Sequence, residues 1–197
     1  MWDKLPDQNN DDIEERLRSV MQNLDVDDAD LPGEDDDAPL IALVYRHADS
    51  IVVTDRLYNT LAERFGDDAI VRESGLGTED IPLAEDLVED DVMLVVIGKK
   101  WLAMKDGDTR LIDDPADPVR QAIETALGLG LPIYPVLVYG AALPRAEFLP
   151  EPIRALAEKP VFRLGSEDEF DINLYQDVDK LVREIAYHME GGIRPAG

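Results

Sequence analysis

Two short polar segments of this chain carry residue types that could bind an anion. Arg46 and His47 follow one apolar segment, and Lys99, Lys100 and Trp101 follow another. Guanidinium and ammonium groups bind phosphates and carboxylates, and an indole ring offers a face on which a nucleotide can stack. We therefore predict a small anion or nucleotide site if the fold brings the two segments together.

Each of these residues also has a structural interpretation. Arg46 could pair with Asp49 or another neighbouring acid and hold its corner of the chain. Asp49 and Ser50 are typical helix caps, which would account for both without a ligand. The two lysines could be solvated or neutralise nearby acids, and the tryptophan could pack beneath its own loop. Both interpretations stay open at this point.

Other candidate chemistry is weak. Gly75 and Gly77 lack the third glycine of a dinucleotide-binding loop and the Gly-Lys-Ser/Thr of a phosphate loop. The acidic run Asp113–Asp117 lacks the spacing of a calcium loop, so we expect a solvated turn. His47 and His188 are the only histidines and there is no cysteine, which makes zinc sites and thiol chemistry improbable. We predict no metal site.

The overall charge limits the partners. The 197-residue chain has 44 acidic and 19 basic residues, a formal net charge of -25, and a pI of about 4.2. Such a surface repels nucleic-acid backbones and anionic lipid, so we predict neither as a partner, whereas a basic protein is allowed. No apolar run is long enough to span a bilayer and the N-terminus has no signal-peptide pattern, so we expect a cytoplasmic protein.

From residue 40 onward, the elements that would position these residues alternate between strand and helix. The expected strands are short and apolar, as buried parallel strands are: Leu40–Tyr45, Ala69–Val71, Val92–Ile97, Ile133–Val138 and Val161–Arg163. The expected helices are Ile51–Phe65, Glu79–Glu89, Val119–Leu129, Ile153–Glu158 and Val178–Met189.

This alternation predicts an α/β fold. We expect a flavodoxin-like five-stranded parallel sheet of order 2-1-3-4-5 with helices on both faces. In that order the switch point lies between the first and third strands. The segments 46–50 and 98–101 would then form any ligand crevice, because ligands of such sheets bind at the carboxyl ends of the strands.

We expect three parts along the chain. Residues 1–38 form an acidic leader, in which Ile13–Leu24 has the spacing of a short amphipathic helix and Asp25–Asp37 has the composition of a solvated linker. Residues 39–190 form the α/β domain, and residues 191–197 form a flexible tail. The leader helix would either dock on its own domain, which we favour, or bind a partner.

Several blocks of sequence stand in order along the predicted domain. They are V-Y-R-H-A-D-S, R-L-Y-N-T-L-A-E-R-F-G, D-V-M-L-V-V-I-G-K-K-W, T-R-L-I-D-D-P-A-D-P-V-R and L-P-I-Y-P-V-L-V-Y-G-A-A-L-P. Together they cover most of Leu40–Leu164 and resemble bacterial TIR (Toll/interleukin-1 receptor-like) domains. The resemblance implies a TIR-like fold. It also implies one of two functions: assembly with other TIR domains, or cleavage of NAD to release nicotinamide.

The helix after the third strand departs from the NAD-cleaving members of that family. Those members carry a Glu that stabilises charge on the ribose as nicotinamide leaves, with an aromatic residue four positions earlier. Here Ala122 stands where the Glu belongs, and Pro118 stands where the aromatic residue belongs. Glu124 lies about 200° around the helix from Ala122, so we expect a solvated helix residue. The resemblance therefore implies no catalytic residue at the usual position.

The loop after the second strand also departs from the family. It reads R-E-S-G-L-G-T-E-D-I-P-L-A-E-D-L, is shorter than usual, and lacks the Pro-Gly-x-x-Phe-like segment that mediates assembly and borders the nucleotide site. We therefore expect a remodelled assembly surface, whose mode of pairing cannot be copied from the family.

These features lead to three hypotheses. The one we favour is a TIR-like signalling domain that acts by contact with other TIR-domain proteins or with itself, with no cofactor. The second is a divergent NAD glycohydrolase or cyclase that uses Glu73, Glu79 or Glu124 as a substitute carboxylate. The third is a module that binds an NAD-type nucleotide at Arg46 and Lys99–Trp101 without chemistry.

Overall fold

The structure, a computed structural model, describes residues 39–75, 83–165 and 174–189. Its main sheet has five strands, which are β1 (Ile41–Val44), β2 (Ile70–Glu73), β3 (Val92–Ile97), β6 (Ile133–Val138) and β7 (Phe162–Leu164). All neighbouring strands are parallel, in the order β2-β1-β3-β6-β7. Numbered within the sheet, this is the order 2-1-3-4-5, so the predicted fold class is confirmed.

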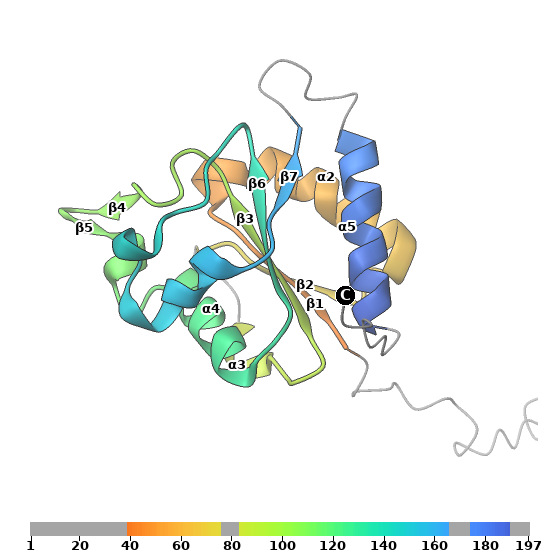
Figure 1. Cartoon of the computed structure of the whole chain (residues 1–197), viewed down its shortest axis with the longest axis horizontal. Helices are drawn as coiled ribbons and strands as arrows, with labels where there is room; N and C mark the ends of the chain where they lie inside the picture. The colour runs from red at the N-terminus through yellow and green to blue at the C-terminus, as the bar shows by residue number, and fades with distance from the viewer. Residues whose placement is uncertain (1–38, 76–82, 166–173, 190–197) are drawn as a thin grey trace, which may run out of the picture. The chain divides into compact units, whose positions relative to one another are not determined.

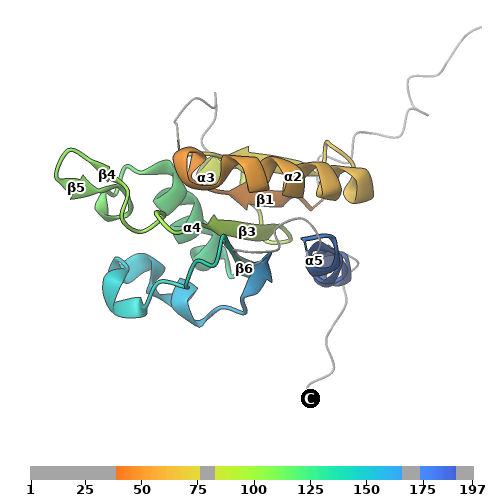
Figure 2. The ribbon, with the colours of Figure 1, turned by 90° about the horizontal axis from the view of Figure 1, so that it is seen from above.

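Helices cover both faces of this sheet (Figures 1 and 2). They are α2 (His47–Phe65), α3 (Leu83–Asp86), α4 (Pro118–Leu129) and α5 (Leu174–Met189), with the 3-10 segments η1 (Leu111–Asp113), η2 (Ala146–Phe148) and η3 (Glu151–Glu158). Helices α2 and α5 pack on one face, and α3, α4 and η3 pack on the other. In both views α4 and α5 lie on opposite sides of the strands.

Successive residues of the central strands pack on opposite faces of the sheet. In β1, Ile41 and Leu43 belong to the cluster under α2 and α5, whereas Ala42 and Val44 belong to the cluster under α4. Every residue of β1, β3 and β6 is buried. The double burial explains why these strands read as continuous apolar runs and not as an alternation of apolar and polar residues.

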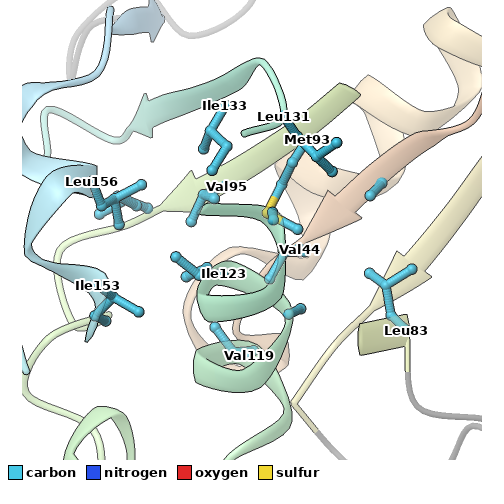
Figure 3. Close-up of a cluster of buried hydrophobic side chains, with 14 of the residues drawn as sticks. Val44, Leu83, Met93, Val95, Val119, Ile123, Leu131, Ile133, Ile153 and Leu156 are labelled. Atoms are coloured by element: carbon cyan, nitrogen blue, oxygen red, sulfur yellow. The ribbon is translucent and has the colours of Figure 1, made fainter. Parts of the chain in front are cut away.

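Helix α4 contributes its apolar side to the second of these clusters. Figure 3 shows Val119 and Ile123 of α4 in the same cluster as Met93 and Val95 of β3. Ala122 belongs to this cluster as well and is fully buried. Ala122, where the sequence resemblance predicts the missing catalytic Glu, is therefore part of the hydrophobic core.

Two local sequence signals set the bounds of α4. Pro118 occupies the first turn, where its missing N–H costs nothing. Gly130 ends the helix with a φ of 76°, a left-handed conformation that an L side chain disfavours. The helix predicted over Val119–Leu129 is confirmed to within one residue.

The start of α2 differs from the prediction. The helix begins at His47, four residues before the predicted Ile51, and no side chain among the described residues caps it. The prediction that Asp49 and Ser50 cap the helix is therefore wrong. Both residues lie inside its first turn, because Arg46 takes the cap position directly after β1.

The structure adds a small antiparallel hairpin between β3 and α4. Its strands are β4 (Lys105–Asp106) and β5 (Thr109–Arg110), joined by a turn in which Gly107 has a φ of 57°. The hairpin was not predicted, although an Asp-Gly pair is a recognised hairpin signal.

Some predictions fall on residues that the structure does not describe. They include the acidic leader over 1–38 and the tail over 191–197, so these boundaries stay predictions. The predicted helix Glu79–Glu89 is described only from residue 83, where α3 lies. Across the described residues, no helix combines the length and the apolar composition needed to cross a bilayer.

Candidate functional site

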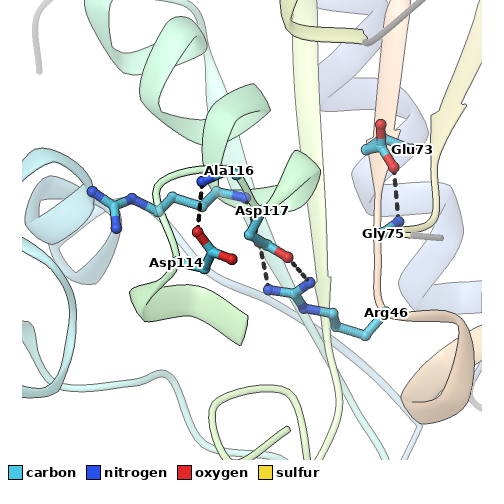
Figure 4. Close-up of polar contacts among 7 residues, drawn as sticks. Arg46, Glu73, Gly75, Asp114, Ala116 and Asp117 are labelled. Atoms are coloured by element: carbon cyan, nitrogen blue, oxygen red, sulfur yellow. Dashed lines mark hydrogen bonds and ion pairs between the residues drawn. The ribbon is translucent and has the colours of Figure 1, made fainter. Parts of the chain in front are cut away.

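Arg46 lies at the carboxyl end of β1 and is almost fully buried, with 1% exposure. Its guanidinium forms two hydrogen bonds to the carboxylate of Asp117, from Nη1 to Oδ2 at 2.5 Å and from Nη2 to Oδ1 at 2.7 Å (Figure 4). The interpretation that Arg46 pairs with an acid fits this geometry, but the acid lies 71 positions away in the chain and is not Asp49. The pair joins the end of β1 to the start of α4.

Asp117 has a second role as the cap of α4. Its Oδ1 also accepts a hydrogen bond from the backbone N–H of Arg120 at 2.8 Å. Asp117 is therefore held both by the guanidinium of Arg46 and by the N-terminus of α4. Asp117 is buried, so the prediction of a solvated turn over Asp113–Asp117 is wrong for this residue.

Gly75 lies against the buried ion pair. A Cβ atom at this position would come within 3.1 Å of both Arg46 Nη1 and Val119 Cγ2, and its φ is 72°. Glu73, buried at the end of β2, accepts a hydrogen bond from Gly75 N–H at 2.7 Å, which fixes the turn (Figure 4). The corner after β1 is consequently closed by backbone from the end of β2.

The other acids of the run make their own contacts. Asp113 pairs with Arg110 of β5 through two bonds of 2.7 Å, and Arg110 Nη1 donates to the carbonyl of Phe148 at 3.1 Å. Asp114 is exposed and accepts from Ala116 N–H at 2.9 Å. Within the part of the chain that the structure describes, no group of three potential ligands could hold a metal ion.

The turn after β3 carries the second predicted segment. Lys99 and Lys100 are exposed, whereas Trp101 is buried in the core, with its ring centroid 5.9 Å from the guanidinium carbon of Arg46. The two predicted segments therefore do come together at the switch point. Trp101 packs beneath this turn in the way its structural interpretation expected.

Asp49 links α2 to this turn. Its Oδ1 accepts a hydrogen bond from Lys100 N–H at 2.9 Å. Gly98 makes this contact possible, because a Cβ there would lie 2.5 Å from Asp49 Oδ2 and 2.8 Å from Oδ1. Two carboxylates of the chain itself thus accept hydrogen bonds at the switch point. Asp117 accepts from the Arg46 guanidinium, and Asp49 accepts from the backbone N–H of Lys100.

The predicted substitute carboxylates lie in different surroundings. Glu73 is buried at the end of β2 and bonded to Gly75. Glu124 lies on the open side of α4 with 47% of its side chain exposed, 3.6 Å from Arg120 Nε. Glu79 lies outside the described residues. Glu124 has the solvated position that the helical rotation from Ala122 predicted.

Cavities lined by described residues border α4 on two sides. One of about 510 Å³ lies among Gly75, the β4–β5 hairpin and residues 113–118, and the other of about 490 Å³ lies between α3 and α4. The first is rich in carboxylates, of which Asp113 and Asp117 are bound to arginines. The second is lined by Glu85, Arg120 and Glu124, among others.

The sequence did not indicate the roles that Asp117 and Gly98 have in this site. A signal for Asp117 existed, since an Asp directly before Pro118 matches a helix cap followed by proline at the first helical position. No local signal pairs Asp117 with Arg46, because that contact depends on how the strands are ordered in space. Glycine is required at position 98 only because the Asp49 carboxylate lies against it, which the local sequence does not show.

No protein-family model matches this chain, and no curated protein matches it. Among solved structures it is similar to the TIR domains in the structure of the activated Roq1 resistosome directly recognizing the pathogen effector XopQ. The identity is 12%, 74% of this chain and 98% of that chain are covered, and the TM-score is 0.47. A likeness at this level adds nothing to the fold class that the sheet order establishes.

Proposed function

We propose that this domain acts by protein–protein contact, as an adapter or as the non-cleaving member of an assembly with other TIR-domain proteins. The resemblance of its sequence blocks to bacterial TIR domains supports the assembly role. The observation that carries the non-cleaving role is the position of Ala122, which is fully buried among apolar side chains. Neither Ala122 nor the neighbouring Pro118 can supply the charge or the ring that NAD cleavage uses in the family.

The state of the switch point supports the same proposal. A nucleotide needs free donors for its phosphates, and Arg46 already gives two hydrogen bonds to Asp117. Removing Arg46 from that pair would leave a buried carboxylate without its partner, which is a large cost. The interactions of a ligand with Arg46 would have to offset this cost before binding became favourable.

The charge of the chain favours a basic partner. A formal net charge of -25 makes contact between two copies repulsive at low salt, whereas a partner with a basic surface is attracted. We therefore propose that the mixed assembly is preferred over self-association.

Nicotinamide release from NAD tests the non-cleaving role. The full chain is assayed at high concentration, with and without crowding agents that promote assembly. The expected result is no release above that of a heat-denatured control. Robust turnover would contradict the proposal, and alanine variants at Glu73, Glu79 and Glu124 would then show which carboxylate is responsible.

Sedimentation velocity of the full chain at low and high salt tests the preferred assembly. We expect a monomer at low salt, and any self-association should grow as salt screens the repulsion between copies. A stable oligomer at low salt that dissociates at high salt would contradict the preference for a basic partner.

A further inference from the structure

The contact between Asp49 and the turn after β3 has the features of an anion site that is already occupied. The carboxylate of Asp49 lies over the backbone at Gly98 and accepts the N–H of Lys100 at 2.9 Å. The exposed side chain of Lys100 belongs to the same turn. A backbone N–H donor, an ammonium group and a residue without a Cβ are the parts from which proteins build oxyanion sites.

Only one of the two oxygens of the Asp49 carboxylate is hydrogen-bonded in this contact. Asp49 Oδ1 is hydrogen-bonded, but Oδ2 is buried and accepts no hydrogen bond from any described residue. A buried acceptor without a donor costs free energy. The intramolecular contact is therefore weaker than one in which both oxygens are engaged, as they are in Asp117.

The Asp49 carboxyl group lies where a side chain on residue 98 would begin. A Cβ at Gly98 would lie between 2.5 and 2.8 Å from all three atoms of the Asp49 carboxyl group. The oxygens thus lie closer to the backbone than any residue other than glycine would permit. Asp49 also sits in the first turn of α2, where the helix dipole favours negative charge.

We propose that the turn Gly98–Lys100 is a binding site for a tetrahedral oxyanion such as a phosphoryl group, and that Asp49 occupies it as an internal competitor. An oxyanion enters only when the Asp49 carboxylate leaves. This site is separate from the Arg46–Asp117 pair, which stays closed. The proposal concerns a ligand and does not depend on whether the domain assembles with partners.

Titration with inorganic phosphate at constant ionic strength tests this proposal. The readouts are the amide chemical shift of Lys100 and calorimetry on the full chain. Asp49→Ala and Asp49→Ser should bind phosphate with an affinity at least about tenfold higher than the wild type. The Lys100 amide should shift in a saturable manner in both variants.

Two variants serve as matched controls. Asp49→Asn keeps a side-chain oxygen that can accept from Lys100 N–H, so it should bind phosphate as weakly as the wild type. Asp108→Ala, at the exposed turn of the β4–β5 hairpin, changes the net charge by the same amount and should also behave as the wild type.

The alternative is that Asp49 only fastens α2 to β3. Folded Asp49→Ala and Asp49→Ser variants without a saturable Lys100 shift would overturn the proposal. An equal gain of affinity in Asp108→Ala would overturn it too, since the effect would then reflect net charge alone. If neither Asp49 variant folds, the carboxylate is a structural fastener and the proposal fails.

Discussion

The corner after β1 and the turn after β3 lie side by side at the carboxyl edge of the sheet, and both place a carboxylate against hydrogen-bond donors. At the corner, Asp117 is buried, with both oxygens bonded to Arg46 and Oδ1 also bonded to Arg120 N–H. At the turn, Asp49 is half-buried and only Oδ1 is engaged.

Burial decides the role of each of these two carboxylates. A buried bidentate pair is costly to break, because each partner would be left as an unpaired charge away from water. A half-buried carboxylate with one engaged oxygen can exchange its bond for water or for a ligand at a small cost. The corner is therefore structural, and the turn is the adjustable part of the switch point.

The largest effect is expected from Asp117→Ala. The variant leaves the Arg46 guanidinium buried without its partner and removes the cap of α4, so the free energy of unfolding should fall by about 3–5 kcal/mol. Urea denaturation measures this loss. Asp114→Ala, at an exposed acid of the same run, should lose no more than about 1 kcal/mol. Equal losses in both variants would refute the distinction between buried and exposed acids.

Ala122→Glu places a carboxylate in the core beneath α4. Because Ala122 is fully buried among apolar side chains, the free energy of unfolding should fall by about 3 kcal/mol or more. Gln121→Glu, one residue earlier on the exposed side, should change stability by no more than about 0.5 kcal/mol. A stable Ala122→Glu variant that releases nicotinamide would show that this position faces a working site after all.

Asp49→Ala should have a smaller effect than Asp117→Ala, with a loss of about 1 kcal/mol, because it removes one hydrogen bond from a half-buried acid. Gly98→Ala should lose about 1–3 kcal/mol, since its Cβ would collide with the Asp49 carboxylate. The double variant should lose less than the sum of the two, because Asp49→Ala removes the collision. Additive losses would contradict the close contact between the two residues.

The smallest effect concerns the exposed hydrogen bond between Tyr58 of α2 and Asp67, which follows the helix. The hydroxyl of Tyr58 donates to Asp67, and this bond raises the pKa of Tyr58 above its usual value of 10.0. A raised pKa means that the stabilisation is fully present below pH 10 and is lost as pH rises through the pKa of the folded state. Tyr58→Phe should therefore be less thermally stable than the wild type at neutral pH, and the difference should be lost as pH rises from 10 through the raised pKa of Tyr58 in the folded protein. A difference that grows with pH would contradict this assignment.

The strands of the sheet could be predicted from the sequence, because parallel strands that are buried on both faces are short, continuous apolar runs. The run Val92–Ile97 is apolar at every position, and it became the central strand β3. The order of the strands followed from topology rules that hold across α/β folds. The short hairpin β4–β5 escaped prediction because two residues per strand carry no periodic pattern.

The site was predictable only in part. The sequence placed Arg46 and Lys99–Trp101 near one another, since both segments follow neighbouring strands. It could not show which acid meets Arg46, because Asp117 is one of several acids in the run 113–117 and only the packing of α4 selects it. The role of Gly98 could not be predicted for the same reason. Glycine is required there because the side chain of Asp49, on another element, leaves no room for a Cβ atom.

Calorimetry of the wild-type chain with NAD, and in parallel with ADP-ribose, tests most directly whether the chain's own carboxylates close the switch point. We expect no saturable heat of binding for either nucleotide, because Arg46 is held by Asp117 and Asp49 holds the turn at Lys100. Saturable binding of NAD that Lys100→Ala abolishes, in a variant with unchanged thermal stability, would show that the switch point is open to a nucleotide.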